Sequence, residues 1–387
     1  MRVSILTPDV SENSLGRAHV LARLLRPEFK VEAVGPQVGQ GVWAPVADDP
    51  EFHVRGVPMK QWGLASGVSA WRQIADSIDA DAVYVSKPFA TALWTAGRCA
   101  SRGVSPLLDI DDWELGMHLE RRSRRSRLDQ AWRAAATLGS LHHRASWNVR
   151  LGERMAHGAW PRTVSGRFLE RRFGGTVVWH SRDTDAFRPG RTDVAAERAS
   201  LGLPADAPVV VFVGTPAPYK GLDDLVQAVA RSRRQAELLV VGLDDSATSK
   251  SVSMLARDAL GRRAHLLGPQ PFARLPALLE LADVVCIPQR ESPATVGQMP
   301  AKLFDAMALG KPVVATRVSD IPEVLADTGV VVSPSAPAEL TSAIDGLLAN
   351  PDEARALGAA ARTRCVELYS DHAMRRVLVP FVKSCLG

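Results

Sequence analysis

Short runs of apolar, mostly β-branched residues recur along the first half of the chain, and segments with a helical spacing of apolar positions separate them. The runs that we expect to form strands are residues 3–7, 31–35, 82–86, 107–109 and 176–179. Helical spacing is clearest over residues 16–26 and 69–78. Near-continuous apolar strands that alternate with helices are typical of a parallel sheet covered on both faces.

The same alternation starts again after Arg188-Pro189-Gly190. The expected strands are residues 209–213, 238–241, 264–267, 284–287 and 313–316, and the expected helices are 222–231, 252–260, 275–281 and 300–309. Two such series predict an α/β protein of two doubly wound, Rossmann-like domains, residues 1–184 and 185–367, with a helix over 368–387 that packs back onto the first. Ligands of such sheets bind at the carboxyl ends of the strands, so we expect a site in a cleft between the domains.

The length of 387 residues suits two domains, and the 46% share of hydrophobic residues excludes disordered and collagen-like chains. Four cysteines without a CxxC pair indicate neither a metal ribbon nor a redox motif. No apolar run approaches the roughly 20 residues of a membrane span, and the N-terminal run ends at Asp9, too early for a signal peptide. We therefore expect a cytoplasmic protein.

The net charge of +5 is unevenly spread, because residues 118–172 hold 13 Arg against 4 acidic residues, a local charge of +9. Cationic residues at 120–127 precede an apolar stripe at helical spacing, which consists of Leu128, Ala131, Trp132, Ala135 and Leu138. We expect residues 118–138 to contact an anionic membrane peripherally, at its inner face. The alternatives are a stripe that packs on the sheet, and a soluble acceptor that is phosphorylated or nucleotide-like. No nucleic-acid partner is expected.

The richest candidate chemistry lies at the start of the helix expected over residues 300–309. Gly297, Gln298 and Met299 precede it, so backbone N–H groups without helical partners should point toward the cleft. Lys302 and Asp305 are three residues apart and share a face. A Lys in the first turn opposes the helix macrodipole unless an anion lies between them, and Asp305 could accept hydrogen bonds from sugar hydroxyls. The alternative is a solvated Lys–Asp pair on an ordinary surface helix.

A second helix start repeats this arrangement. The expected strand at 209–213 continues into Gly214-Thr215, and Lys220 precedes the next helix. Two lysines at two helix starts in one domain indicate a diphosphate clamp, whereas a plain strand–turn–helix with an exposed Lys is the alternative.

These segments give the second half of the chain a specific resemblance. Lys220-Gly221 after Gly214 is similar to the donor-phosphate loop of glycosyltransferase family four, and residues 305–314 resemble its Glu-Ala-Met-Ala-x-Gly-x-Pro-Val-Val signature. Residues 180–187, His-Ser-Arg-Asp-Thr-Asp-Ala-Phe, resemble its hinge, Asn-Gly-Val-Asp-Thr-x-x-Phe. The resemblance is near-continuous over residues 176–332 and looser over residues 1–175.

The resemblance implies a retaining, nucleotide-sugar-dependent transferase of the two-domain GT-B fold that needs no metal or other cofactor. Lys220 and Lys302 would stabilise the departing diphosphate, and Asp305 would orient the donor. The acceptor hydroxyl would attack from the face that the leaving group vacates, and a diphosphate oxygen would take its proton. The residues expected to contact the donor are Gly16, Gly214, Thr215, Leu267, Gly297, Gln298 and Met299.

The chain departs from that family's pattern at three positions. Thr215 stands where the family commonly has Arg. The signature pairs two Glu separated by seven residues, but here the second is Asp305 and the first position is Gly297. Glu291 could substitute only if the intervening loop is longer than usual. We infer that Lys302, which some branches of the family share, replaces the missing Arg as the second phosphate cation.

Polar residues after the strands of the first half are candidates for binding the acceptor. We expect Lys87, Asp111 and Asp112 to do so, because neighbouring aspartates repel unless a cation, a hydroxyl-rich ligand or Arg meets them. Helix capping is the alternative. Metal ligation that also involves Asp109 is conceivable, but the resembled enzymes need no metal, so none is expected. Gly16 ends a segment that the resemblance places near donor and acceptor, although a bare tight turn fits equally well.

Three functions are consistent with these features. The one we favour is a retaining glycosyltransferase that moves a sugar from a nucleoside diphosphate sugar to an acceptor hydroxyl, in the biosynthesis of a glycan, glycolipid or glycosylated metabolite. A nucleotide-sugar epimerase would need acid–base residues, for which Asp111, Asp112 and Glu114 are candidates. A sugar-nucleotide-binding protein without transfer activity would account for the missing first carboxylate.

Overall fold

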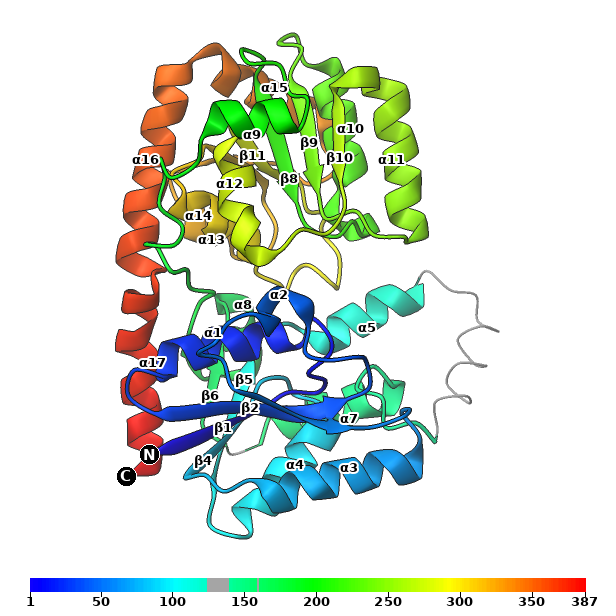
Figure 1. Cartoon of the computed structure of the whole chain (residues 1–387), viewed down its shortest axis with the longest axis vertical. Helices are drawn as coiled ribbons and strands as arrows, with labels where there is room; N and C mark the ends of the chain where they lie inside the picture. Colours follow the sequence, from blue (N-terminus) through cyan, green and yellow to red (C-terminus); the bar gives the residue numbers. More distant parts are fainter. Residues whose placement is uncertain (124–138, 159) are drawn as a thin grey trace. The chain divides into compact units, whose positions relative to one another are not determined.

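The computed structural model describes residues 1–123, 139–158 and 160–387 (Figure 1). The chain divides into two compact units. The N-terminal unit comprises Met1–His180, Val296–Met299 and Met374–Gly387, and the C-terminal unit comprises Ser181–Thr295 and Pro300–Ala373. The sequence led us to expect a boundary after residue 184 and a returning helix from residue 368. The structure divides the chain after residue 180, and the last segment of the N-terminal unit begins at residue 374.

The N-terminal unit is built on a seven-stranded parallel sheet with the order β3-β2-β1-β4-β5-β6-β7. The strands are β1 (Arg2–Leu6), β2 (Lys30–Gln37), β3 (Val54–Pro58), β4 (Ala82–Val85), β5 (Ser105–Ile110), β6 (Arg162–Val164) and β7 (Thr176–Val177). Val3 of β1 pairs with Val31 on one side and with Ala82 on the other, so the strand order reverses at β1. This is the doubly wound topology that the alternating pattern predicts.

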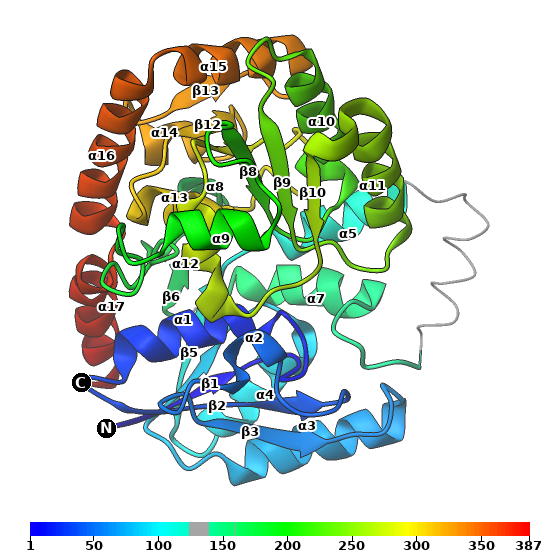
Figure 2. The same cartoon turned by 45° about the horizontal axis from the view of Figure 1, so that its top comes forward.

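Helices cover both faces of this sheet. They are α1 (Leu15–Leu25), α2 (Ala44–Ala47), α3 (Leu64–Ser77), α4 (Ala90–Ala100), α5 (Glu114–Ser123), α7 (Ser146–Ala156), α8 (Arg167–Phe173) and most of α17 (Asp371–Leu386). Figure 2 shows α3 and α4 on one side of the sheet and α1 on the other. On the α3 side, Trp71, Ile74 and Leu93 pack against Val83 and Leu108, which gives the unit a continuous apolar core.

The C-terminal unit has a six-stranded parallel sheet with the order β10-β9-β8-β11-β12-β13. The strands are β8 (Val209–Val213), β9 (Glu237–Val241), β10 (Ala264–Leu267), β11 (Val284–Ile287), β12 (Val313–Thr316) and β13 (Val330–Val332). The helices are α9 (Val194–Ser200), α10 (Leu222–Arg231), α11 (Ala247–Leu260), α12 (Leu275–Glu280), α13 (Ala301–Ala308), α14 (Ile321–Leu325), α15 (Pro337–Ala349) and α16 (Pro351–Leu368). All residues of β8, β9, β11 and β12 are buried, as expected for strands covered on both faces.

The parallel α/β fold of both units confirms the predicted fold class, whereas three of the described strands were missed. The first, β3, is a partly exposed edge strand that contains Gly56 and ends in Pro58, and these residues conceal a strand pattern. The other two, β6 and β13, are each only three residues long. Pro300 is the N-cap residue of α13, so this helix begins at Ala301, one residue later than expected.

Of residues 118–138, for which we expected a membrane contact, the structure describes only 118–123, at the end of α5. The apolar stripe at 128–138 therefore lies outside the described residues. None of the described helices combines the length and the apolar character needed to cross a membrane.

Candidate functional site

The loops after β8 and β11 of the C-terminal unit adjoin, because these strands are neighbours where the strand order reverses. Arg290 joins the two loops. Its backbone N–H donates to the carbonyl oxygen of Tyr219 at 2.8 Å, and its guanidinium donates to Asp223 and Asp224 in the first turn of α10 at 2.6–2.8 Å. Gly221 lies in the left-handed region with φ of 64°, and a Cβ there would lie 2.0 Å from the Pro288 carbonyl oxygen. The turn before α10 is therefore held in one conformation.

Lys220 lies in this turn, at the end of a short 3-10 segment, Pro218–Lys220. Its Nζ donates to the carbonyl oxygen of Thr215 at 2.7 Å, and a Cβ on Gly214 would lie 3.6 Å from Nζ. The structure thus brings together Gly214, Thr215 and Lys220, three of the residues singled out in the sequence. Leu267 ends β10, two strands away at the same edge of the sheet, and its carbonyl oxygen accepts from the backbone N–H groups of Gly242 and Leu243 at 3.0 Å.

The first turns of α13 carry the other two residues of the expected diphosphate site. Lys302 Nζ lies 3.3 Å from Asp305 Oδ2, and the Lys302 side chain is 29% exposed. Asp305 is fully buried, and its Oδ1 accepts from Nε of Arg182. Burial raises the pKa of Asp305, but the guanidinium of Arg182 and the ammonium of Lys302 outweigh it and hold that pKa below its ordinary value. The carboxylate therefore lies ionised between two cations.

Two residues of this site, Arg182 and Arg290, were not predicted from the sequence. Arg182 and Asp305 are 123 positions apart, and Arg290 and Asp224 are 66 positions apart. No local spacing rule links residues so distant along the chain. The only signal in the sequence is the Arg of His180-Ser-Arg-Asp, which stands where the resembled hinge has Val.

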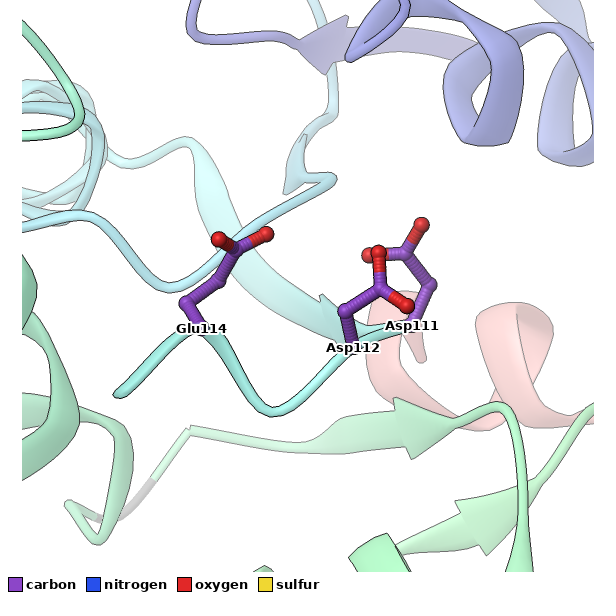
Figure 3. A group of neighbouring side chains, drawn as sticks. All are labelled: Asp111, Asp112 and Glu114. Carbon is purple, nitrogen blue, oxygen red and sulfur yellow. The ribbon is translucent and has the colours of Figure 1, made fainter. Parts of the chain in front are cut away.

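In the N-terminal unit, polar side chains gather where the neighbouring strands β4 and β5 end. Lys87 follows β4, and its Nζ lies 2.7 Å from Asp111 Oδ1, 3.0 Å from Asp112 Oδ2 and 2.8 Å from Glu114 Oε1. Figure 3 shows that the three carboxylates belong to one stretch of chain, from the end of β5 to the start of α5. The structure thus brings together Lys87, Asp111, Asp112 and Glu114, four residues that were singled out in the sequence.

Burial governs the titration of Asp111. Burial, together with the negative charges of Asp112 and Asp109, raises the pKa of Asp111 to about 7 against the attraction of Lys87. Burial alone would lower the pKa of Lys87, but the three carboxylates keep it well above its usual value. Lys87 therefore stays protonated while Asp111 exchanges its proton near neutral pH.

The carboxylates of Asp111, Asp112 and Glu114 also form a group that could hold a metal ion, because their ligand atoms all lie within 4.8 Å of one another. The protonated Lys87 ammonium contacts all three and already supplies a positive charge. Asp109 is not part of this group. It accepts two hydrogen bonds of 2.8 Å from buried Arg17, a residue that the sequence analysis did not single out, and one of 2.6 Å from Thr163.

Gly16 is the second residue of α1, and a Cβ there would lie 3.4 Å from the Trp43 ring. The turn before it is held by Asp9, which accepts from the Ser11 N–H at 2.8 Å and from its hydroxyl at 2.6 Å. Burial raises the pKa of Asp9. Gly16 therefore belongs to the helix, and the turn lies in the residues before it.

Val296–Met299 belongs to the N-terminal unit, so three expected donor-binding residues, Gly297, Gln298 and Met299, are part of that unit. The Gly297 carbonyl oxygen accepts from the Trp113 N–H at 3.1 Å, and Gln298 Nε2 donates to Asp112 Oδ1 at 3.2 Å. Met299 is buried. A Cβ on Gly297 would lie 2.4 Å from Trp113 Cβ, so no carboxylate side chain fits there. Glu291 is exposed.

Residues 207–350 match the family model described as "Glycosyl transferases group 1". The chain is similar to the D-inositol 3-phosphate glycosyltransferase of Segniliparus rotundus, with 38% identity over 187 residues, 46% of this chain and 40% of that protein. The enzyme of the same name from Mycobacterium bovis is 37% identical over 179 residues, 44% of this chain and 35% of that protein. The chain thus spans less than half the length of these curated relatives.

Solved structures show the same fold over nearly the whole chain. HepE of Anabaena, in complex with UDP and glucose, matches with a TM-score of 0.79 and 16% identity over 99% of this chain and all of that chain. Sucrose-phosphate synthase of Thermosynechococcus elongatus matches with a TM-score of 0.76 and 19% identity over 99% of this chain and 98% of that chain.

Proposed function

We propose that this chain transfers a sugar from a nucleoside diphosphate sugar to an acceptor hydroxyl. Residues 207–350 match the glycosyl transferases group 1 family, and the two units have the folds of GT-B glycosyltransferases. One observation carries the proposal. Lys220 and Lys302 lie at two helix starts that follow neighbouring strands, within the segment that matches the family. Two cations at the carboxyl edge of a parallel sheet suit an anionic nucleotide.

In the proposed mechanism, Lys220 and Lys302 stabilise the negative charge that develops on the departing diphosphate. Lys220 Nζ is held by the Thr215 carbonyl oxygen, and Lys302 Nζ by Asp305, so both ammonium groups are oriented before the donor binds. Because Asp305 is fully buried, we assign it the role of holding Lys302 rather than of contacting sugar hydroxyls. The acceptor oxygen bonds to the anomeric carbon on the face from which the diphosphate leaves. A diphosphate oxygen takes the acceptor proton, and the configuration is retained.

The acceptor site proposed is the carboxylate cluster around Lys87. Carboxylate oxygens accept hydrogen bonds from hydroxyl groups. Three carboxylates that share one ammonium group keep lone pairs with which they can bind a ligand. Their surplus of negative charge disfavours a phosphorylated acceptor. This supports an acceptor rich in hydroxyl groups, such as a glycan, a glycolipid or a small metabolite.

We further propose that the reaction requires no metal ion and no other cofactor, since the nucleotide sugar is a substrate. Lys220 and Lys302 supply the positive charge that a divalent cation would otherwise bring to the diphosphate. In the N-terminal unit, Lys87 supplies the charge that a cation would bring to the group of Asp111, Asp112 and Glu114.

From charge and apolar spacing, we also propose that residues 118–138 contact the inner face of an anionic membrane peripherally. A cytoplasmic location is part of this proposal. Co-sedimentation with phosphatidylglycerol vesicles at low and high salt tests it. We expect binding at low salt that is lost when Arg121, Arg122, Arg124 and Arg125 become Gln. Binding that survives these four substitutions would contradict the membrane contact.

The proposed activity is tested by incubating the protein with UDP-, GDP- and ADP-sugars, alone and with a panel of sugar, polyol and glycolipid acceptors. Transfer to an acceptor, with the anomeric configuration of the donor kept, supports the proposal. Interconversion of free donors without an acceptor would identify an epimerase instead. Calorimetric binding of a donor with neither hydrolysis nor transfer would leave a binding protein.

A further inference from the structure

The Arg182 side chain forms the most buried ion pair of the C-terminal unit, and the proposed chemistry does not yet use it. The Arg182 side chain is 4% exposed and that of Asp305 is 0% exposed. The Arg182 backbone is fixed on both sides, because its N–H donates to the Tyr369 carbonyl oxygen at 3.1 Å and its carbonyl oxygen accepts from Asp371 at 2.9 Å. Because the Arg182 backbone is held in this way, its guanidinium can reach few other partners.

The other contacts of this guanidinium are to uncharged oxygens. Nη1 donates to the Ser181 carbonyl oxygen at 2.6 Å, and Nη2 donates to the carbonyl oxygen of Ala301, the first residue of α13, at 3.0 Å. Among the described residues, Asp305 is therefore the one carboxylate to which Arg182 donates a hydrogen bond. The full positive charge of Arg182 serves to balance this carboxylate.

The charge balance bears on Lys302. Asp305 Oδ2 lies 3.3 Å from Lys302 Nζ, and Oδ1 accepts from Arg182. Taken together, two cations and one anion leave one net positive charge at the start of α13. Without Arg182, Lys302 would be the sole counter-charge of a buried carboxylate, and the net charge offered to a diphosphate would fall to zero.

We propose that Arg182 is a positioning residue that neutralises Asp305 and thereby keeps the charge of Lys302 available for the donor diphosphate. This inference rests on the proposed function and adds to it a residue that acts through two others. It also links two departures from the resembled family. Arg182 stands where the family's hinge motif has Val, and Asp305 stands where its signature has Glu.

The test is a double-mutant cycle of R182M, D305N and R182M/D305N. Calorimetry measures the affinity for UDP, GDP and ADP and for the matching nucleosides, and the ratio of the two affinities reports the contribution of the diphosphate. We expect R182M to reduce this ratio about tenfold, because a charge-assisted contact is lost. The double variant should regain most of the ratio, because removing the Asp305 charge frees Lys302 again.

A matched control separates this effect from damage to α13. Arg362 donates to the carbonyl oxygens of Phe187, at 2.9 Å, and of Ala308 at the other end of α13, and among the described residues it donates to no carboxylate. R362M should lower the melting temperature without changing the affinity ratio. Melting curves of all variants give their folded fractions at the temperature of the titration.

The outcomes distinguish the two proposals. A wild-type protein that binds no nucleoside diphosphate more tightly than its nucleoside contradicts the proposed function. A wild-type protein that does so, together with an R182M variant of unchanged ratio, contradicts only the role of Arg182. A folded double variant as impaired as R182M would show that Arg182 acts through packing and would also overturn the inference.

Discussion

The two units carry ion clusters of opposite sense. In the N-terminal unit one ammonium, Lys87, lies among three carboxylates. In the C-terminal unit one carboxylate, Asp305, lies between two cations. Both clusters lie at carboxyl ends of parallel strands, so topology alone does not separate their roles. We propose that the sign of the surplus charge separates them, with an anionic diphosphate bound by the C-terminal unit and a hydroxyl-rich ligand by the N-terminal unit.

The largest effect should come from removing the central cation of the N-terminal cluster. Lys87→Met leaves three largely buried carboxylates without their counter-charge, and we expect a loss of about 3–5 kcal/mol in the free energy of unfolding. Urea unfolding measures it. Lys383→Met is the matched control, since Lys383 forms an exposed pair with Glu28 at 2.6 Å and should contribute less than about 1 kcal/mol. Equal effects of the two variants would contradict the charge balance described for Lys87.

The next effect concerns the cations of the C-terminal unit. Lys220→Ala and Lys302→Ala should each weaken donor binding by about 1.5–3 kcal/mol, because each removes a charge-assisted contact to the diphosphate. The double variant should lose less than the sum if both lysines hold one phosphate group. Lys250→Ala, at an exposed position of α11, serves as the control. Strictly additive losses would argue against a shared clamp.

The titration of Asp111 predicts a pH dependence of stability. Its folded pKa of about 7 is raised above the unfolded value near 4, so its contribution to stability is fully present below pH 4 and is lost as the pH rises through 7. Asp111→Asn should therefore flatten the decline in unfolding free energy between pH 5 and pH 8 by on the order of 1–2 kcal/mol. Urea midpoints across this range measure it. Parallel curves for the wild type and the variant would refute the assignment.

The smallest expected effect is that of chelation. EDTA should leave transfer activity unchanged, because lysines supply the positive charge in both clusters. Assays with and without EDTA, followed by added Mg²⁺ or Mn²⁺, provide the measurement. Activity that is lost in EDTA and restored by either ion would make Asp111, Asp112 and Glu114 a metal site.

Local patterns in the sequence predicted much of the fold and part of each cluster. The apolar runs at 209–213 and 284–287 gave β8 and β11 with their observed bounds, because fully buried strands have uniformly apolar sequences. The spacing of Lys302 and Asp305 on one helix face predicted their contact, since residues three apart are neighbours on a helix.

Contacts between distant segments could not be predicted in this way. Arg17 with Asp109 and Arg182 with Asp305 depend on which strands and loops adjoin, and periodicity carries no such information. The sequence showed that Gly297 stands where the family has a carboxylate, but it did not show why. The reason is the close approach of Trp113.

The most direct test of the account is calorimetric titration of the wild type and of the Lys220→Ala/Lys302→Ala variant with UDP, GDP and ADP and with their nucleosides. The account predicts that at least one diphosphate binds the wild type tenfold or more tightly than its nucleoside, that added salt reduces this advantage, and that the double variant loses it. A nucleoside that binds as tightly as its diphosphate, or a folded double variant with an undiminished advantage, would contradict the claim that these two lysines hold the donor diphosphate.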